Sequence, residues 1–485
     1  MPGDGNRPIP QAIKKSVTSW MSDFTTQPNP ASRKQMFLAM SGIAASAVVV
    51  AFDATIISTS LPNVVQALGG MDFYAWVGTG YFLATAITIL IFGRLGDLFG
   101  RKPLMIISMS IVTVGSVLGG LSQSMEQLII FRVIQGLGGG MMIASTFAAP
   151  ADLFPDPKRR VRWMLMTSIT FATASGFGPV IGGAITQELG WRAAFFVTPI
   201  AALVGIITTW LYFPWIKPKH VTSLKLDWLG AVLVALGIGA PLAGLELLTA
   251  KGNFSLNMWG LGVVMMGVFA LFLLIPIERK ATTPIFPLRI LRTKEARNLN
   301  LAGLLSGAVM FILIFYIPLL LQDSFGFSPT RAGLLMTPLV AGTSIGSIVN
   351  GRLFSKQNEP GRLMVFGSIL LSIGCLLTLT FSITSPDCWI LLSMSLCGIG
   401  LGFLLPNFTL FMQMLAEQRD VGIASALIQT TRALGSAFGT ALVGVIISYL
   451  PISLGIKIGL ALCVVAAFLI AFVCSRIHMR NFSTS

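Results

Sequence analysis

Charged side chains are scarce in this sequence. Asp, Glu, Lys and Arg make up 11% of its 485 residues, whereas hydrophobic residues make up 54%. A soluble globular domain carries about 25% charged residues, so this composition excludes that class. The apolar residues fall into runs of about 20, the length that an α-helix needs to cross roughly 30 Å of hydrocarbon. The sequence therefore predicts an all-α membrane protein.

Histidine and cysteine are also rare, which bears on enzymes and metal sites. The two histidines, His220 and His478, lie in polar regions, and the five cysteines form no CxxC pair. The nucleotide-binding pattern GxxxxGK[ST] does not occur. We therefore expect no catalytic residues, no metal site and no cofactor, with an ion gradient as the source of energy.

Lysine and arginine outnumber aspartate and glutamate by 33 to 18, which gives a formal net charge of +15. The basic residues lie between apolar runs, so we attribute the charge to membrane topology and expect no nucleic-acid partner. Alternate connections are basic, such as the one that holds Arg94, Arg101 and Lys102, and the connections between them are nearly free of charge. Because cytoplasmic loops carry the excess of Lys and Arg, we expect both termini in the cytoplasm and an even number of spans.

Apolar runs separated by charged or Pro/Gly-rich breaks predict fourteen transmembrane helices, arranged as two six-helix halves with two inserted linker helices. The predicted domains are a cytoplasmic N-terminal segment (1–35), an N-terminal half (36–214), a linker with two extra transmembrane helices (215–297), a C-terminal half (298–475) and a cytoplasmic tail (476–485). In the first segment, apolar residues three or four apart fit either a helix on the membrane surface or a disordered tail.

An internal repeat supports the two halves. "GRLGDLFGRKPLMIIS" from Gly93 is echoed by "GRLFSKQNEPGRLMVFGS" from Gly351, and Gly178 and Gly183 correspond to Gly439 and Gly444 at an offset of about 261 residues. Parallel six-span repeats are one way in which secondary transporters are built, with the substrate site near the midplane of the membrane.

Asp53, Arg132 and Arg432 lie well inside apolar runs. A charged side chain at that depth is costly unless it faces a cavity or a partner. We predict that Asp53 takes up and releases a coupling proton; the alternative is a structural carboxylate that is paired permanently with Arg132 or caps a broken helix. For Arg432, a role at the substrate and a structural role that ties its helix to its neighbours both stay open.

Four motifs together resemble a known family. They are "FDATIISTSLP" around Asp53, "GRLGDLFGRK" from Gly93, "RVIQGLGGGM" from Arg132 and "GFGPVIGG" from Gly176. With the predicted spans and the repeat, they resemble the fourteen-span drug:proton antiporter branch of the major facilitator superfamily, which includes EmrB-like and QacA-like exporters. The resemblance covers nearly the whole chain after residue 36. It departs at Ser58 and Thr198, where relatives commonly carry Asn.

The resemblance implies roles for three groups of residues. Asp53 and Arg132 would couple transport to protons, the loop after the second span would latch the two halves together, and the glycine-proline motif would accompany antiport. In the latch, Asp97 would meet the start of span 13, and Arg101 would bridge to Asp152; a loop that only orients the protein is the alternative. The latch comprises Gly93, Asp97, Gly100, Arg101, Lys102 and Asp152, and the antiporter motif comprises Gly176, Gly178, Pro179, Gly182 and Gly183.

The function implied is proton-coupled efflux of lipophilic drugs or toxic compounds by alternating access across a bacterial inner membrane. The alternative is a dedicated exporter of a metabolite, siderophore or fatty acid. We expect a broad, apolar and aromatic substrate cavity in a monomer that is embedded in the lipid bilayer. The sequence does not decide whether a periplasmic adaptor protein is a further partner. Candidate cavity residues are Tyr81, Gln135, Phe311, Tyr316, Met336, Phe403 and Arg432.

Overall fold

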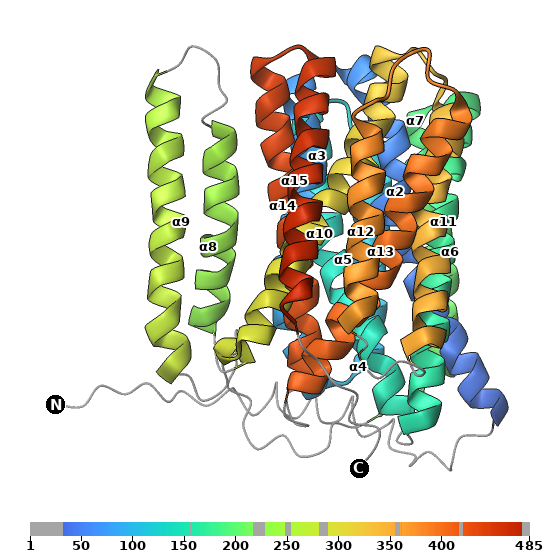
Figure 1. The fold of residues 1–485 in the computed structure, drawn as a ribbon. Coiled ribbons are helices and arrows are strands. Elements are labelled where there is room, and N and C mark those ends of the chain that lie inside the picture. The colour runs from blue at the N-terminus through green and yellow to red at the C-terminus, as the bar shows by residue number, and fades with distance from the viewer. Residues whose placement is uncertain are drawn as a thin grey trace.

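The computed structural model describes residues 33–154, 157–216, 228–247, 254–280, 290–354, 359, 361–416 and 421–477. Across these ranges the chain is built of long α-helices with short connections, and no strand occurs (Figure 1). The prediction of an all-α protein is confirmed. The alternatives for the N-terminal segment concern residues that lie almost entirely outside the described ranges.

The helices follow the predicted order of six, two and six. The first six are α2 (Arg33–Leu68), α3 (Tyr74–Phe99), α4 (Arg101–Gly120), α5 (Met125–Leu153), α6 (Pro157–Leu189) and α7 (Trp191–Tyr212). The next two are α8 (Trp228–Leu247) and α9 (Phe254–Lys280). The last six are α10 (Lys294–Leu319), which continues into a short π-helix, η3 (Leu320–Ser324), then α11 (Pro329–Phe354), α12 (Gly361–Thr378), α13 (Asp387–Leu415), α14 (Val421–Tyr449) and α15 (Ile452–Ser475).

Twelve stretches of the described residues are long and apolar enough to cross a membrane. The chain is therefore a multi-span membrane protein. Helices α6 and α8 are not among these twelve. The predicted count of fourteen spans is therefore not established by length and composition.

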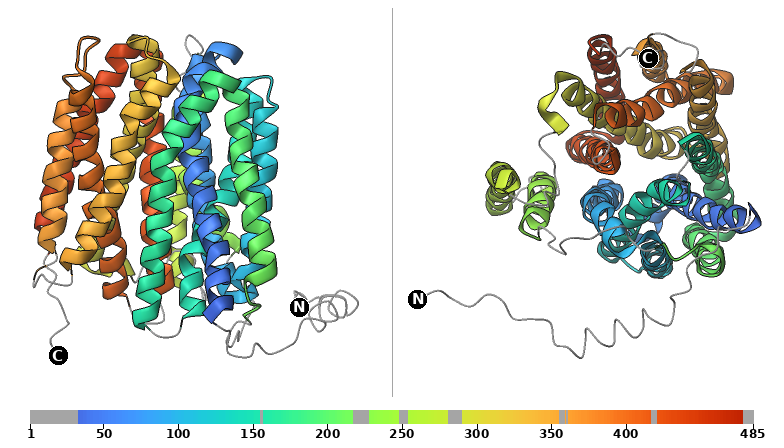
Figure 2. Two further views of the ribbon diagram at one scale, coloured as in Figure 1. Left: turned by 90° about the vertical axis from the view of Figure 1, so that its right-hand side faces the viewer. Right: turned by 90° about the horizontal axis from the view of Figure 1, so that it is seen from below.

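The first and last six helices pack in the same pattern. In the first set α2 contacts α6 and α7, and α5 contacts α3 and α4; in the last set α10 contacts α14 and α15, and α13 contacts α11 and α12. The two sets meet along α3 with α14, α6 with α11, and α2 with α10. Helices α8 and α9 pack on each other at the edge of the bundle, beside α3 and α14 (Figure 2).

Glycines at matching positions account for this shared packing. A β-carbon on Gly136 of α5 would collide with the main chain of Tyr81 in α3, and one on Gly398 of α13 with the main chain of Leu339 in α11. In membranes, small residues let helix backbones approach closely because no hydrophobic force draws helices together. The sequence repeat is thus also a repeat of helix contacts.

Single glycines make the sharpest turns between helices. Gly100 and Gly190 have φ values of +85° and +83°, and each is the one residue between two consecutive helices, α3 and α4 in the first case and α6 and α7 in the second. A side chain is strained in this left-handed region, whereas glycine is not.

We call the face of the bundle where α2 begins and α15 ends the terminal face, and the opposite face the far face (Figure 1). Both ends of the described chain lie on the terminal face, as an even number of crossings requires.

Candidate functional site

Four side chains from three helices meet inside the first six helices. Asp53 comes from α2, Tyr81 from α3, and Arg132 and Gln135 from α5, and each is 2% exposed or less. Arg132 Nη1 lies 3.5 Å from Asp53 Oδ1, the long end of ion-pair geometry. The predicted pairing of the carboxylate with Arg132 is therefore present, but it is a loose contact.

Gln135 bridges Asp53 and Arg132. Its amide nitrogen donates to Asp53 Oδ1 at 2.7 Å, and its amide oxygen accepts from Arg132 Nη1 at 2.9 Å. Arg132 also donates from Nε to the carbonyl of Val77 at 3.4 Å. A residue predicted for the substrate cavity thus stands between the two residues predicted for proton coupling.

Tyr81 closes the cluster from the side of α3. The guanidinium carbon of Arg132 lies 4.2 Å from the centre of the Tyr81 ring, a cation–π contact. Three buried atoms make no well-formed hydrogen bond to any described residue: Asp53 Oδ2, Tyr81 Oη and Arg132 Nη2. An unsatisfied buried polar atom costs about 1–3 kcal/mol, and three in one cluster mark a site that is not built for stability alone.

This arrangement suits a carboxyl group that changes its protonation state. One oxygen of Asp53 is held by an amide and a guanidinium, while the other makes no well-formed hydrogen bond to a described residue, and the Tyr81 hydroxyl is near the carboxyl group. Protonation would remove the charge that holds Arg132, so it would change the balance of contacts between α2, α3 and α5.

The predicted latch region adopts a tight helix–helix turn. Arg101 and Lys102 have buried side chains; Arg101 Nη1 donates to the carbonyl of Gly93 at 3.4 Å, and Lys102 Nζ donates to the carbonyl of Trp210 at 2.7 Å. Lys102 therefore caps the last turn of α7, where a cation is favourable. A β-carbon on Gly93 would lie 3.6 Å from the methyl group of Ala426, so this end of α3 faces the beginning of α14.

The side chains of Asp97 and Asp152 lie outside the described part of the structure. The contact of Asp97 with span 13 and the bridge between Arg101 and Asp152 therefore stay predictions.

The antiporter motif places α6 between the two sets of helices. β-carbons on Gly178 and Gly182 would collide with Thr55 and Ile56 of α2, and one on Gly183 would collide with Pro329 of α11. A β-carbon on Gly176 would find Ala341 of α11 at an ordinary 3.5 Å, and the carbonyl of Pro179 accepts a hydrogen bond from Thr59 at 3.2 Å. The motif thus lets α6 touch α2 on one side and α11 on the other.

Hydrogen bonds join the two sets of helices towards the far face. Tyr74 donates to the carbonyl of Phe315 at 2.8 Å, and the hydroxyls of Thr79 and Thr440 are 3.0 Å apart. Within the last set, Tyr316 of α10 donates to the carbonyl of the same Thr440 at 2.6 Å and so supports this contact. Gln322 of η3 donates to the carbonyl of Thr59 at 2.9 Å. We call these contacts the far-face seam.

Comparison with known proteins identifies the family of this chain. The sequence profile of the Major Facilitator Superfamily matches residues 43–440. The chain belongs to the major facilitator superfamily. The predicted resemblance at the level of the superfamily is therefore confirmed.

The relatives of this superfamily member include named drug transporters. Multidrug resistance protein 3 of Bacillus subtilis is 32% identical over 429 residues, covering 87% of this chain and 81% of that protein. The multidrug transporter protein MdtP of the same organism is 29% identical over 404 residues, covering 82% and 73%. Among solved structures, an auto-inhibited peptide transporter of the POT family superposes with a TM-score of 0.65 at 14% identity, covering 93% and 99%, which shows the shared fold.

As a member of this superfamily, the chain is a membrane transporter of small molecules and not an enzyme.

Its predicted cavity residues have different surroundings. Phe311 is partly buried and its ring centre lies 4.1 Å from that of Phe82, whereas Met336 and Tyr316 are fully buried. Phe403 packs edge-to-face on Phe366 of α12, between two helices of the last set.

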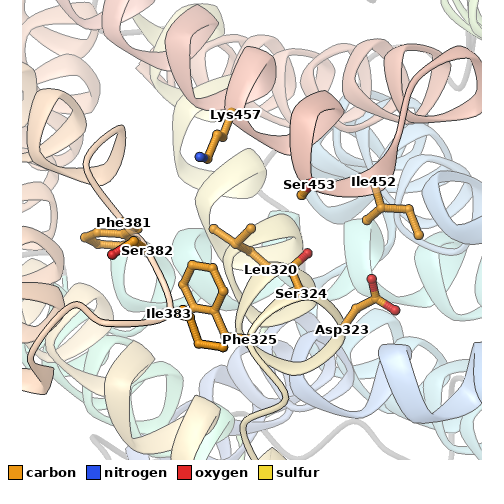
Figure 3. Close-up of a pocket in the computed structure, with 10 residues that line it drawn as sticks. All are labelled: Leu320, Asp323, Ser324, Phe325, Phe381, Ser382, Ile383, Ile452, Ser453 and Lys457. Carbon is orange, nitrogen blue, oxygen red and sulfur yellow. The ribbon is translucent and has the colours of Figure 1, made fainter.

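A cavity of about 570 Å³ opens at the far face of the transporter, and none of the predicted site residues lines it (Figure 3). Side chains from η3, from the connection of α12 to α13 and from α15 line it, among them Asp323, Phe325, Ser382 and Lys457.

Sequence reasoning missed the far-face seam of this transporter. Its members are single Thr, Tyr and Gln residues inside apolar runs, and their pairing depends on contacts between helices far apart in the chain. A tyrosine or glutamine at an interior position could have indicated these contacts, because such groups find a hydrogen-bond partner when they are buried.

Proposed function

We propose that this transporter is a fourteen-span drug:proton antiporter that exports lipophilic compounds from the cytoplasm across the plasma membrane of a bacterium. The names of the Bacillus relatives, a multidrug resistance protein and a multidrug transporter, support drugs as the cargo. In this proposal α6 and α8 also cross the membrane. Residues 36–214 and 298–475 form the two moving halves, 215–297 form the linker, and both termini are cytoplasmic.

One observation carries the proton coupling. Asp53 is buried, holds Arg132 only loosely, and has one carboxylate oxygen that makes no well-formed hydrogen bond to a described residue, with the Tyr81 hydroxyl beside the carboxyl group. Arg132 and Tyr81 are the charged and titratable groups that the described helices place against it. In the proposed cycle, a proton from outside binds Oδ2 when the far-face seam is open, and it leaves to cytoplasmic water when that seam is closed.

The closed far-face seam supports the direction of the cycle. Its hydrogen bonds join the two sets on the side opposite the termini, so they close that side in the described state. In the proposed cycle, substrate enters from the terminal, cytoplasmic face once α3 and α14 separate at Gly93 and Ala426. The latch of Asp97 against α14 would hold the opposite, outward-facing state. The transporter works as a monomer in this account, with the proton gradient as its energy source.

Drug accumulation in an efflux-deficient bacterium tests this function. Cells that express the wild type should accumulate less of several lipophilic dyes and drugs than cells that express Asp53→Asn at an equal level in the membrane. An uncoupler should abolish the difference. If the wild type lowers the accumulation of no compound across a broad panel, the transporter is a dedicated exporter of one metabolite. Export that needs a co-expressed adaptor would identify that further partner.

A further inference from the structure

The interior of this transporter carries a second arginine whose charge has no partner among the described residues. Arg432 lies at the twelfth position of the 29-residue helix α14, deep in the bundle. Its carbonyl accepts a hydrogen bond from Ser436 at 2.9 Å, but no hydrogen bond or ion pair to a described residue engages its guanidinium. The side chain is only partly buried. Part of the residue is therefore not covered by packed protein atoms.

Helical spacing shows which way Arg432 points. Ser425, Gln429, Arg432 and Ser436 are separated by four, three and four residues and so share one face of α14. The exposed apolar residues Phe438 and Leu442 lie about 80° or more around the helix from this polar face. A face of Ser, Gln and Arg directed to lipid would be costly, so it is turned to the interior.

Contacts on both sides of this polar face also place it in the interior of the bundle. Gln413 of α13 donates to Ser425 at 2.7 Å, and Ser436 donates to the carbonyl of Gly307 in α10 at 3.3 Å. A β-carbon on Gly307 would lie 3.1 Å from Cγ of Arg432, so the stem of the arginine crosses α10 at this glycine.

Aromatic rings lie one helical turn away. Phe311 follows Gly307 by four residues and so lies on the same face of α10. It is partly buried, and it packs on Phe82 of α3, with Phe315 beyond at a ring distance of 6.4 Å. An arginine and an aromatic surface one turn apart complement a molecule with an anionic head and an apolar ring body.

The charges inside the bundle also favour an anionic ligand. Asp53 is bonded to Gln135 and Arg132, so it does not neutralise Arg432. Helices α11 and α14 contain no acidic residue. Among the described side chains midway along the two six-helix sets, two arginines stand against one aspartate, which leaves this region positive, and more so when Asp53 is protonated. An organic cation would meet repulsion in this low-dielectric space, whereas an anion would be attracted.

We propose that Arg432 binds the anionic group of the substrate, and that this transporter prefers amphipathic organic anions, such as aromatic carboxylates, over cations of the same shape. This inference rests on the proposed function, because it names the chemical class of the exported compound. The guanidinium suits a carboxylate because its planar N–H groups can donate two parallel hydrogen bonds. The ring body of the substrate would lie against Phe311.

A matched pair of fluorescent probes tests the proposal on the purified, detergent-solubilised full chain. Pyrenebutyrate carries a carboxylate, and its ammonium analogue of the same length carries the opposite charge on the same ring system. We expect the wild type to bind the carboxylate at least about tenfold more tightly than the ammonium probe. Arg432→Gln should abolish this preference, and Arg432→Lys should retain only part of it, because lysine keeps the charge but not the fork of donors.

Arg331→Gln is the matched control, since Arg331 is 48% exposed and paired with Asp387 at the far face; it should keep the full preference. Elution as a single monodisperse peak shows that each variant is folded. Equal or undetectable binding of the two probes by the wild type would overturn the proposal, as would a carboxylate preference that survives in Arg432→Gln. Because this assay uses no proton gradient, such a result would leave the proton-driven export of the proposed function standing.

Discussion

Gln135 donates its amide hydrogen to Asp53 Oδ1 at 2.7 Å, a shorter contact than the 3.5 Å that separates Asp53 from Arg132. The carboxylate is therefore held mainly by a neutral amide. This matters for a proton site, because a tight ion pair with arginine would keep the acid permanently ionised.

Replacement of this amide tests its importance. Gln135→Leu removes the hydrogen bonds to both Asp53 and Arg132, and a hydrogen bond to a charged group contributes about 1.5–3 kcal/mol. We expect transport driven by a pH gradient to fall about tenfold or more in everted vesicles at matched expression. Gln187→Leu, at an exposed position of α6, is the control and should transport at the wild-type rate. A Gln135→Leu variant with the wild-type rate would show that the bridge has no role.

Two tyrosine-to-phenylalanine variants should behave differently. The Tyr81 hydroxyl makes no well-formed hydrogen bond to a described residue, whereas Tyr316 donates to the carbonyl of Thr440 at 2.6 Å. Tyr81→Phe keeps the ring on Arg132, so we expect an unchanged melting temperature but a change in the dependence of transport on pH. Tyr316→Phe leaves a buried carbonyl with one partner fewer and should lower the melting temperature by a few degrees. A drop in stability confined to Tyr81→Phe would reverse this assignment.

Neighbouring glycines of the antiporter motif give a matched pair for packing. Gly178→Ala drives a methyl group into Thr55, and overpacking of this kind costs about 1–3 kcal/mol. Gly176→Ala meets Ala341 at an ordinary 3.5 Å and should be tolerated. We expect Gly178→Ala alone to lower both the melting temperature in detergent and the transport rate. Equal effects of the two substitutions would mean that the close contact between α6 and α2 determines neither the melting temperature nor the transport rate.

A reversible cross-link can test whether the far-face seam opens during transport. The hydroxyls of Thr79 and Thr440 are 3.0 Å apart, in helices from opposite sets. In a chain with Cys388→Ser, which removes the exposed native cysteine, Thr79→Cys combined with Thr440→Cys should form a disulfide under oxidation and stop transport. Reduction should restore it, and neither single variant should respond to oxidant. Full transport by the oxidised double variant would show that these helices do not separate.

The sequence predicts the long helices well because hydropathy and length are properties of each segment alone. Every predicted apolar run coincides with a long helix, and the repeat seen around Gly178 and Gly439 reappears as equivalent packing. The place of Asp53 and Arg132 in one cluster could also be predicted, since an isolated charge inside the bundle needs a partner.

The sequence does not specify how each helix is rotated or which neighbour it meets. Gln135 was expected in the substrate cavity, and the structure places it between Asp53 and Arg132. Phe403 was expected in the same cavity, yet its ring lies against Phe366 of α12. Both positions depend on contacts between helices from separate parts of the chain, which local pattern does not encode.

The most direct test of the central claim uses the purified protein in proteoliposomes with an aromatic carboxylate or a drug that the wild type transports. The wild type should accumulate the compound against its gradient when a pH gradient is imposed. Asp53→Asn should still exchange the compound down its gradient but should show no accumulation driven by the pH gradient. Accumulation by Asp53→Asn at the wild-type level would contradict the assignment of Asp53 as the proton-coupling residue.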